Sequence, residues 1–201
     1  MPEVLKTLNI AEDQTSTVWD YRGETTPNGG RIALRACVHH IPVIRNVAGR
    51  GDLDQLRQVL LDRRPPTGGL MVQFGTDAEG NIALYTRADR LCFQAKGANQ
   101  VSCGIEHMHF LTSDPWTRKQ LRAAAWIAQY LEREFDIPLQ MAQVEPGNGV
   151  ASIVRKGHTS HQHIAHMAGF NDRTDPGTGF DYEYMFHAAK FFKANGHFVG
   201  A

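Results

Sequence analysis

The apolar residues follow two repeating patterns along the chain, one typical of strands and one typical of helices. Residues 31–39 alternate between apolar and other side chains, which predicts a strand that runs up to a pair of histidines. Residues 70–86 hold two short apolar runs on either side of a turn at Gly80, which predicts a β-hairpin. Further strands are predicted over 100–111 and 149–157.

Apolar residues at every third or fourth position predict helices between and after these strands. The clearest helix covers 113–135, where Asp114 would cap the first turn and Pro115 would occupy its first position. Shorter helices are predicted over 52–64 and 181–196. Because strands and helices interleave, the expected fold class is α/β, with a central mixed sheet flanked by helices.

The chain of 201 residues is long enough for one domain with a sizeable core. Residues 1–29 are polar and include the turn sequence TTPNGG, so they are predicted to form an N-terminal arm. Residues 30–201 are predicted to form the single folded domain.

Composition excludes several classes of protein. The 21 basic residues balance the 21 acidic ones, which gives no electrostatic case for binding nucleic acid or an anionic membrane. Three widely spaced cysteines without a CxxC pair favour neither a disulfide scaffold nor a thiolate zinc site. The first residues, MPEVLKTLNIAEDQ, contain no secretory signal, and no apolar run approaches membrane-spanning length.

Histidine is the unusual component, with ten residues, four of which fall between His158 and His166. Such a cluster beside Asp175 favours a metal site, because histidine and aspartate are both zinc ligands. One histidine of the 39–40 pair, one of the 161–166 cluster and Asp175 would give the three protein ligands of a catalytic zinc. His39 and His40 point to opposite faces of their strand, so at most one of them can contribute.

The segment GIEHMHF offers two competing interpretations. Glu106 could face the site as a general base, or His107 and His109, which share the other strand face, could bind a metal. Arg173 is a candidate cation for stabilising an oxyanion, because it lies two residues before Asp175.

Four motifs occur in an order that resembles the zinc-dependent N-acetylmuramoyl-L-alanine amidases, the type 2 amidase family that includes phage endolysins and peptidoglycan recognition proteins. They are a strand ending in VHH, the hairpin MVQFGTDAEGNIALY, the segment SCGIE, and a histidine-bearing loop ending in TDPGTGFDY. The likeness covers about residues 30–192 and implies that residues 30–201 are an amidase catalytic domain.

The resemblance also implies roles for individual residues. His39, the first histidine of VHH, and Asp175 would bind Zn²⁺, and Glu106 would be the catalytic acid, with His107 and His109 on the outer face. The remaining ligand would be His161, with His163 and His166 as alternatives; if 161–165 is extended, His161 and His163 share a face.

Two positions depart from the family pattern. Arg173 replaces a common lysine or histidine, and would stabilise the oxyanion without acting as an acid. Phe93 and Gln94 stand where the family often has a Trp-His pair, which would change a substrate contact.

The expected activity is therefore hydrolysis of the amide between N-acetylmuramic acid and L-alanine of peptidoglycan, in a long open groove. The alternatives are a peptidoglycan-binding module without activity, or a zinc peptidase acting within the stem peptide. We expect a monomer whose partner is peptidoglycan, with no nucleic acid or membrane partner. A phage endolysin fits best, made in the host cytoplasm without a signal peptide and acting at the cell wall.

Overall fold

A sheet of seven strands runs through the computed structural model, which describes residues 3–11, 14–22, 29–42, 50–62, 72–109, 111–113 and 115–195. The strand order is β1-β2-β5-β4-β6-β3-β9. These strands are β1 (Glu3–Ala11), β2 (Gln14–Asp20), β3 (Ala36–His40), β4 (Phe74–Thr76), β5 (Ile82–Leu84), β6 (Ser102–His107) and β9 (Gly157–Ser160). A separate antiparallel pair is formed by β7 (Gln143–Glu145) and β8 (Ser152–Arg155).

The sheet is mixed, as the interleaved sequence pattern predicts. β1 pairs with β2, and β4 with β5, in antiparallel fashion, whereas β2–β5, β4–β6, β6–β3 and β3–β9 are parallel. Four helices accompany the sheet: α1 (Arg50–Asp62), α2 (Arg118–Phe135), α3 (His161–Met167) and α4 (Tyr182–Ala194). The α/β class, with a central mixed sheet and accompanying helices, is therefore confirmed.

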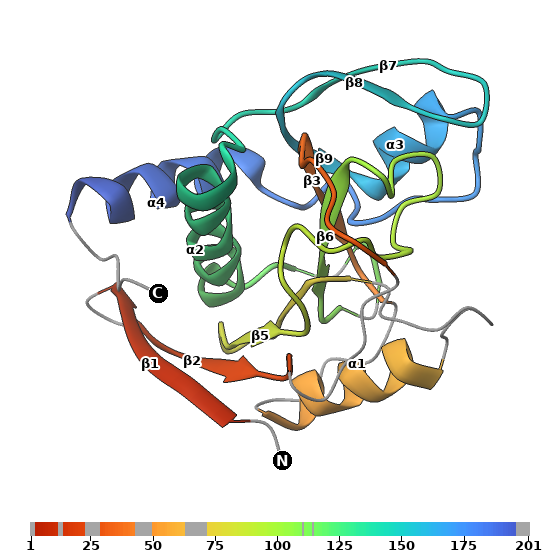
Figure 1. Cartoon of the computed structure of the whole chain (residues 1–201). Helices are drawn as coiled ribbons and strands as arrows, with labels where there is room; N and C mark the ends of the chain where they lie inside the picture. The colour runs from red at the N-terminus through yellow and green to blue at the C-terminus, as the bar shows by residue number, and fades with distance from the viewer. Residues whose placement is uncertain are drawn as a thin grey trace.

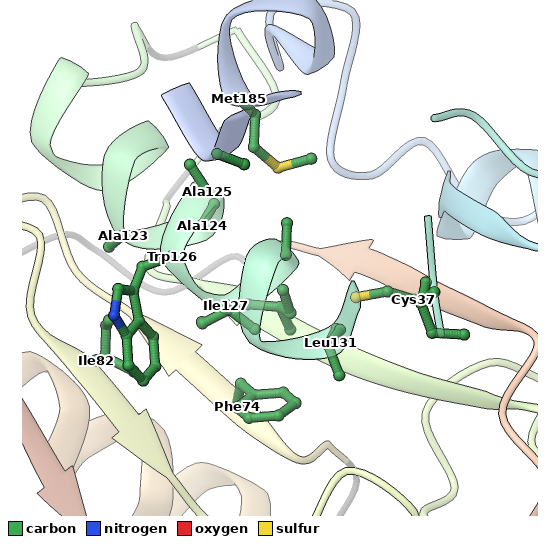
Figure 2. Packing of buried hydrophobic residues seen from close by; sticks show 14 of the residues in the cluster. Cys37, Phe74, Ile82, Ala123, Ala124, Ala125, Trp126, Ile127, Leu131 and Met185 are labelled. Atoms are coloured by element: carbon green, nitrogen blue, oxygen red, sulfur yellow. The ribbon is translucent and has the colours of Figure 1, made fainter. Parts of the chain in front are cut away.

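Helices α2 and α4 lie together on one face of the sheet (Figure 1). The predicted apolar stripe of α2 is buried, and Figure 2 shows Ile127 and Leu131 directed from this helix toward Phe74 and the sheet. Alanines 123–125 are also fully buried in this cluster, and Met185 of α4 packs into the same cluster. The other face is covered by α1 and α3, each with its own apolar cluster.

Helix α2 begins later than its sequence predicts. Thr117 is the N-cap, and its hydroxyl accepts a hydrogen bond from the backbone N–H of Gln120. Pro115 therefore precedes the helix, and the prediction that it opens the first turn is wrong. Asp114, the predicted cap, and Gly196, the predicted end of the last helix, lie outside the described residues.

Three other segments differ from expectation. Much of the predicted arm, 1–29, belongs to the sheet, because β2 pairs with both β1 and β5. The segment predicted as one strand over 149–157 divides into β8 and the start of β9, on either side of Lys156. Residues 161–167, expected within a loop, form helix α3. None of the described helices combines the length and apolarity that crossing a membrane requires.

The turn between β4 and β5 confirms the predicted hairpin and contains a buried carboxylate. Asp77 accepts hydrogen bonds from the backbone N–H and the side-chain Nδ2 of Asn81, at 2.8 and 2.9 Å. Gly80, at φ 83°, supplies the left-handed conformation that the turn requires. Burial raises the pKa of Asp77 to about 6, against the lowering effect of the hydrogen bonds from Asn81.

We expect Asp77 to make stability depend on pH between about 4 and 6. Its folded-state pKa is raised, so its contribution is fully present below the unfolded pKa and is lost as pH rises through 6. Relative to Asp77→Asn, the wild type should therefore lose about 2–3 kcal/mol of unfolding free energy between pH 4 and pH 7. Urea denaturation of both proteins across this range measures it, and a constant difference would contradict the burial argument.

Candidate metal centre

The ends of three parallel strands bring together side chains that are far apart in the sequence. In the register of the sheet His40 lies opposite Glu106 of β6. His39 lies opposite Ser160 of β9, so His40 is level with His161, the first residue of α3. Because parallel strands end at the same edge of a sheet, these three side chains gather where β3, β6 and β9 stop.

His40, His161 and Asp175 form a compact group at this edge. One potential ligand atom from each lies within 4.8 Å of the others. The Nδ1 atoms of His40 and His161 are 3.4 and 3.2 Å from the same oxygen, Oδ2 of Asp175. All three side chains are buried, and the two imidazole rings meet edge to face at 4.5 Å.

The short helix α3 fixes the position of His161 relative to Asp175. Ser160 caps the helix by accepting a hydrogen bond from the backbone N–H of His163. The backbone N–H of Gln162 donates to the carbonyl oxygen of Asp175 at 3.0 Å, which ties the loop after α3 to its first turn. The carboxylate is thereby held beside both histidines.

Gln94 determines which nitrogen of His40 faces Asp175. Its Nε2 donates to the Ser102 hydroxyl at 2.6 Å, so its Oε1 is left to accept from Nε2–H of His40, also at 2.6 Å. The Nδ1 atom of His40 is then the one directed at the carboxylate. This is the arrangement by which a partner orients a metal-binding histidine.

The three groups shift one another's pKa values. Burial alone would raise the pKa of Asp175, but hydrogen bonds from His161 and His40 outweigh it and hold the pKa well below its usual range. Burial would lower the pKa of His40, but Asp175, Glu106 and Gln94 together raise it. The pKa of His161 is lowered, mainly by burial and then by the charge of His40.

The structure does not bring His39 to this group, and His40 takes the place that the sequence resemblance implied for His39. Successive strand residues point to opposite faces, and His39 lies on the face covered by α2 and α4, where its ring packs 4.8 Å from that of Phe180. The group that could bind a metal ion in this pocket therefore contains His40, His161 and Asp175, without His39.

The other histidine expectations have mixed outcomes. Among the three named for the remaining position, the structure places His161 in the group, whereas Nδ1 of His163 lies 3.2 Å from the Thr159 hydroxyl and His166 is exposed. Because 161–167 is helical, the shared face of an extended segment does not arise. His107 and His109 were expected on an outer face, but both side chains are buried.

An open pocket of about 490 Å³ lies over the group, and Glu106 and Arg173 both line it. Glu106 is half-buried, whereas Arg173 is exposed and donates from Nη1 to the backbone oxygen of Asp172 at 3.2 Å. The charge of Arg173 contributes to the lowered pKa of His161. A second hollow of about 460 Å³, lined by His163 and His166, adjoins the first at Arg173 and Thr174, which line both.

Sequence reasoning assigned Gln94 to a substrate contact, whereas its side chain is buried and binds His40. A contact between residues 54 positions apart leaves no local signal. The choice of His40 over His39 depends on which face of β3 is turned toward His161 and Asp175, and because both faces are buried, the strand pattern alone does not reveal it.

Comparisons with known proteins identify a family and solved structures of the same fold. Residues 33–178 match the family model described as N-acetylmuramoyl-L-alanine amidase (Amidase_2). Comparison with curated protein sequences gives no significant match.

Three solved structures share the fold at low sequence identity. The amidase LysC from Clostridium intestinale URNW is 14% identical with a TM-score of 0.56, over 86% of this chain and 97% of that one. A complex of peptidoglycan recognition proteins LCa and LCx with bound tracheal cytotoxin is 13% identical with a TM-score of 0.57, over 87% of this chain and 92% of that one. An AmpD structure is 18% identical with a TM-score of 0.54, over 84% of this chain and 88% of that one. Since the family model matches most of the chain, including every strand and loop that builds the site, the chain belongs to the N-acetylmuramoyl-L-alanine amidase family.

Proposed function

We propose that the protein is a zinc-dependent amidase that hydrolyses the bond between N-acetylmuramic acid and L-alanine of peptidoglycan. The observation that carries this proposal is the meeting of His40, His161, Asp175 and Glu106 in one open pocket. Membership of the amidase family supports the same reaction.

The donor set suits zinc. Two imidazole nitrogens and one carboxylate oxygen match the ligand types and the number of protein ligands of a catalytic zinc, which leaves a further position open. Gln94 fixes Nδ1 of His40 as the available nitrogen, and Asp175 is ionised. When bound, zinc acts as a Lewis acid toward a carbonyl oxygen and makes water a stronger acid.

Glu106 is proposed as the general base and acid. It lines the same pocket as the three ligand residues and faces the same side of the sheet as His40, its register partner. Its carboxylate would take a proton from the attacking water and return it to the amine nitrogen of L-alanine as the amide bond breaks. Arg173, at the pocket rim, would add positive charge near the developing oxyanion.

The shape of the site supports a large substrate. Two adjoining hollows share Arg173 and Thr174, so the depression extends past the candidate metal ligands on the side of α3. A glycan strand with its peptide needs an extended open surface of this kind. A role of the endolysin type, at the bacterial cell wall, is part of the proposal, and it is supported by the fold shared with LysCS, which is described as an endolysin amidase. A monomeric state stays a prediction.

Digestion of purified cell walls tests the proposal. We expect new free L-alanine amino groups, muramic acid without peptide in mass spectra, loss of both after chelation, and recovery when Zn²⁺ is restored. Products in which alanine stays attached to muramic acid would identify a peptidase instead. Retention of wall fragments without any cleavage would identify a binding module, the function suggested by the structural neighbour with bound tracheal cytotoxin.

Replacing Gln94 with leucine should weaken zinc binding. The change removes the acceptor for Nε2–H of His40, and loss of such an orienting partner typically costs about 10–100-fold in metal affinity. Competition with a zinc-binding dye measures this loss. Gln94→Glu keeps an acceptor oxygen and should bind zinc more tightly than the leucine variant; equal affinity of wild type and Gln94→Leu would contradict the assigned role.

Replacing Arg173 with alanine should lower kcat by about 10–100-fold with a smaller change in KM, because its charge is proposed to act in the transition state. Arg173→Lys keeps the charge and should recover part of the rate. Arg155→Ala, an exposed change on β8, is the matched control. A change confined to KM would show that Arg173 only binds substrate.

A further inference from the structure

A second group of potential ligands lies on the opposite face of the same strands. Cys37 and His39 of β3 and His158 of β9 each place one ligand atom within 4.8 Å of the others. Cys37 and His158 are register partners in the sheet, so their side chains lie side by side. All three are fully buried, and Cys37 forms no disulfide.

A chain of hydrogen bonds ends at this group without a terminal partner. The Thr76 hydroxyl contacts Nδ1 of His107 at 2.7 Å, and Nε2 of His107 contacts Nδ1 of His39 at 3.0 Å. Nε2 of His39 in turn contacts Nδ1 of His158 at 3.0 Å. Each neutral ring donates once and accepts once, so the chain can run in either direction.

In both directions Nε2 of His158 is left over. It is a bare lone pair in one direction and an N–H in the other, and it has no hydrogen-bond partner among the described residues. The hydroxyl of Tyr182 is a second buried polar atom without a partner there. A buried unsatisfied polar atom typically costs about 1–3 kcal/mol, so two beside one thiol indicate a missing component.

The surroundings favour a metal ion as that component. The rings of Phe180, Tyr182 and Phe186 pack around His39 and His158, which makes the space apolar and closed. Both imidazoles are fully buried, where the neutral form, which binds metals, is favoured over the charged one. Burial raises the pKa of the Cys37 thiol, which keeps its proton until an ion displaces it.

We infer that Cys37, His39 and His158 form a buried site for a zinc-class divalent cation, separate from the pocket that holds His40. Binding replaces the thiol proton, which leaves to solvent, with a sulfur–metal bond. His158 contributes Nε2, its nitrogen without a partner, and His39 contributes Nε2, which gives up its hydrogen bond to Nδ1 of His158. The ion ties β3 and β9 together beneath α4 and stabilises the edge of the sheet that carries the other site.

Cobalt substitution tests this inference independently of the proposed amidase activity. A thiolate bound to Co²⁺ gives a near-ultraviolet charge-transfer band, and the group of His40, His161 and Asp175 contains no thiolate. The protein is therefore made with His161→Ala and produced in zinc-depleted, Co²⁺-supplemented medium. We expect one equivalent of cobalt and a clear charge-transfer band in this background.

Three further changes in that background assign the band. Cys37→Ser should abolish it, and His158→Gln should weaken or shift it. Cys92→Ser, a change at a buried cysteine in a separate apolar cluster, should leave it unchanged. Chelation should lower the melting temperature of the His161→Ala protein but not that of its Cys37→Ser derivative. Absence of the band in the His161→Ala protein, or its persistence after Cys37→Ser, would overturn the inference.

Discussion

Replacing Glu106 with glutamine is expected to lower the rate of amide hydrolysis by about a thousandfold, with zinc content and fold unchanged. Glutamine has nearly the same shape but cannot take a proton, and Glu106 is the carboxylate that lines the pocket from the strand beside His40. The effect should be on kcat, because proton transfer is needed in the transition state and contributes little to holding the wall polymer.

The rate of free L-alanine release from cell walls measures this effect, with Glu145→Gln as the matched control. Glu145 lies exposed on β7, so its replacement should leave the rate unchanged. Zinc content, measured on the same samples, separates loss of the base from loss of the metal. A Glu106→Gln protein with more than about a tenth of wild-type activity would remove Glu106 from the proposed chemistry.

Replacing His40 with alanine is expected to have an effect at least as large, by a different route. The change leaves two protein ligands at the proposed zinc site, His161 and Asp175. Activity should fall by more than about a hundredfold. Removing a residue that only orients a ligand costs at most about that much, and removing the ligand itself should cost more. Zinc bound in the pocket should be lost with it.

Its neighbour His39 provides the contrast. His39→Gln should keep most of the activity, because His39 lies on the other face of β3. It should instead lower the unfolding free energy by about 1–3 kcal/mol, since His107 and His158 both lose a buried partner. If His39→Gln loses activity and His40→Ala retains it, the assignment of the two histidines is reversed.

Local patterns predicted much of the fold. The hairpin around Asp77 and the apolar stripe of α2 depend on residues close together in sequence, and both are confirmed. The first turn of α2 was misplaced because a competing cap, Thr117, lies three residues beyond Asp114. Helix α3 was missed although Ser160 offers a cap, because its histidines were interpreted as part of a loop.

The candidate site was predictable only in part. Asp175, His161 and Glu106 were identified from motif order, and the structure places them around one pocket. The choice between His39 and His40 needed the tertiary structure, because strand alternation shows that they face opposite ways but not which face is turned toward His161 and Asp175. The role of Gln94 and the group around Cys37 depend on contacts across more than fifty residues, which leave no pattern in the sequence.

The central claim is that His40, His161 and Asp175 bind zinc in the open pocket. Anomalous diffraction recorded at the zinc absorption edge, from crystals of the zinc-loaded protein, tests it most directly. The account predicts a peak in the pocket about 2.0–2.2 Å from Nδ1 of His40, a ring nitrogen of His161 and a carboxylate oxygen of Asp175. A pocket without a peak, or a pocket ion bound by His39, His163 or His166 instead, would contradict it.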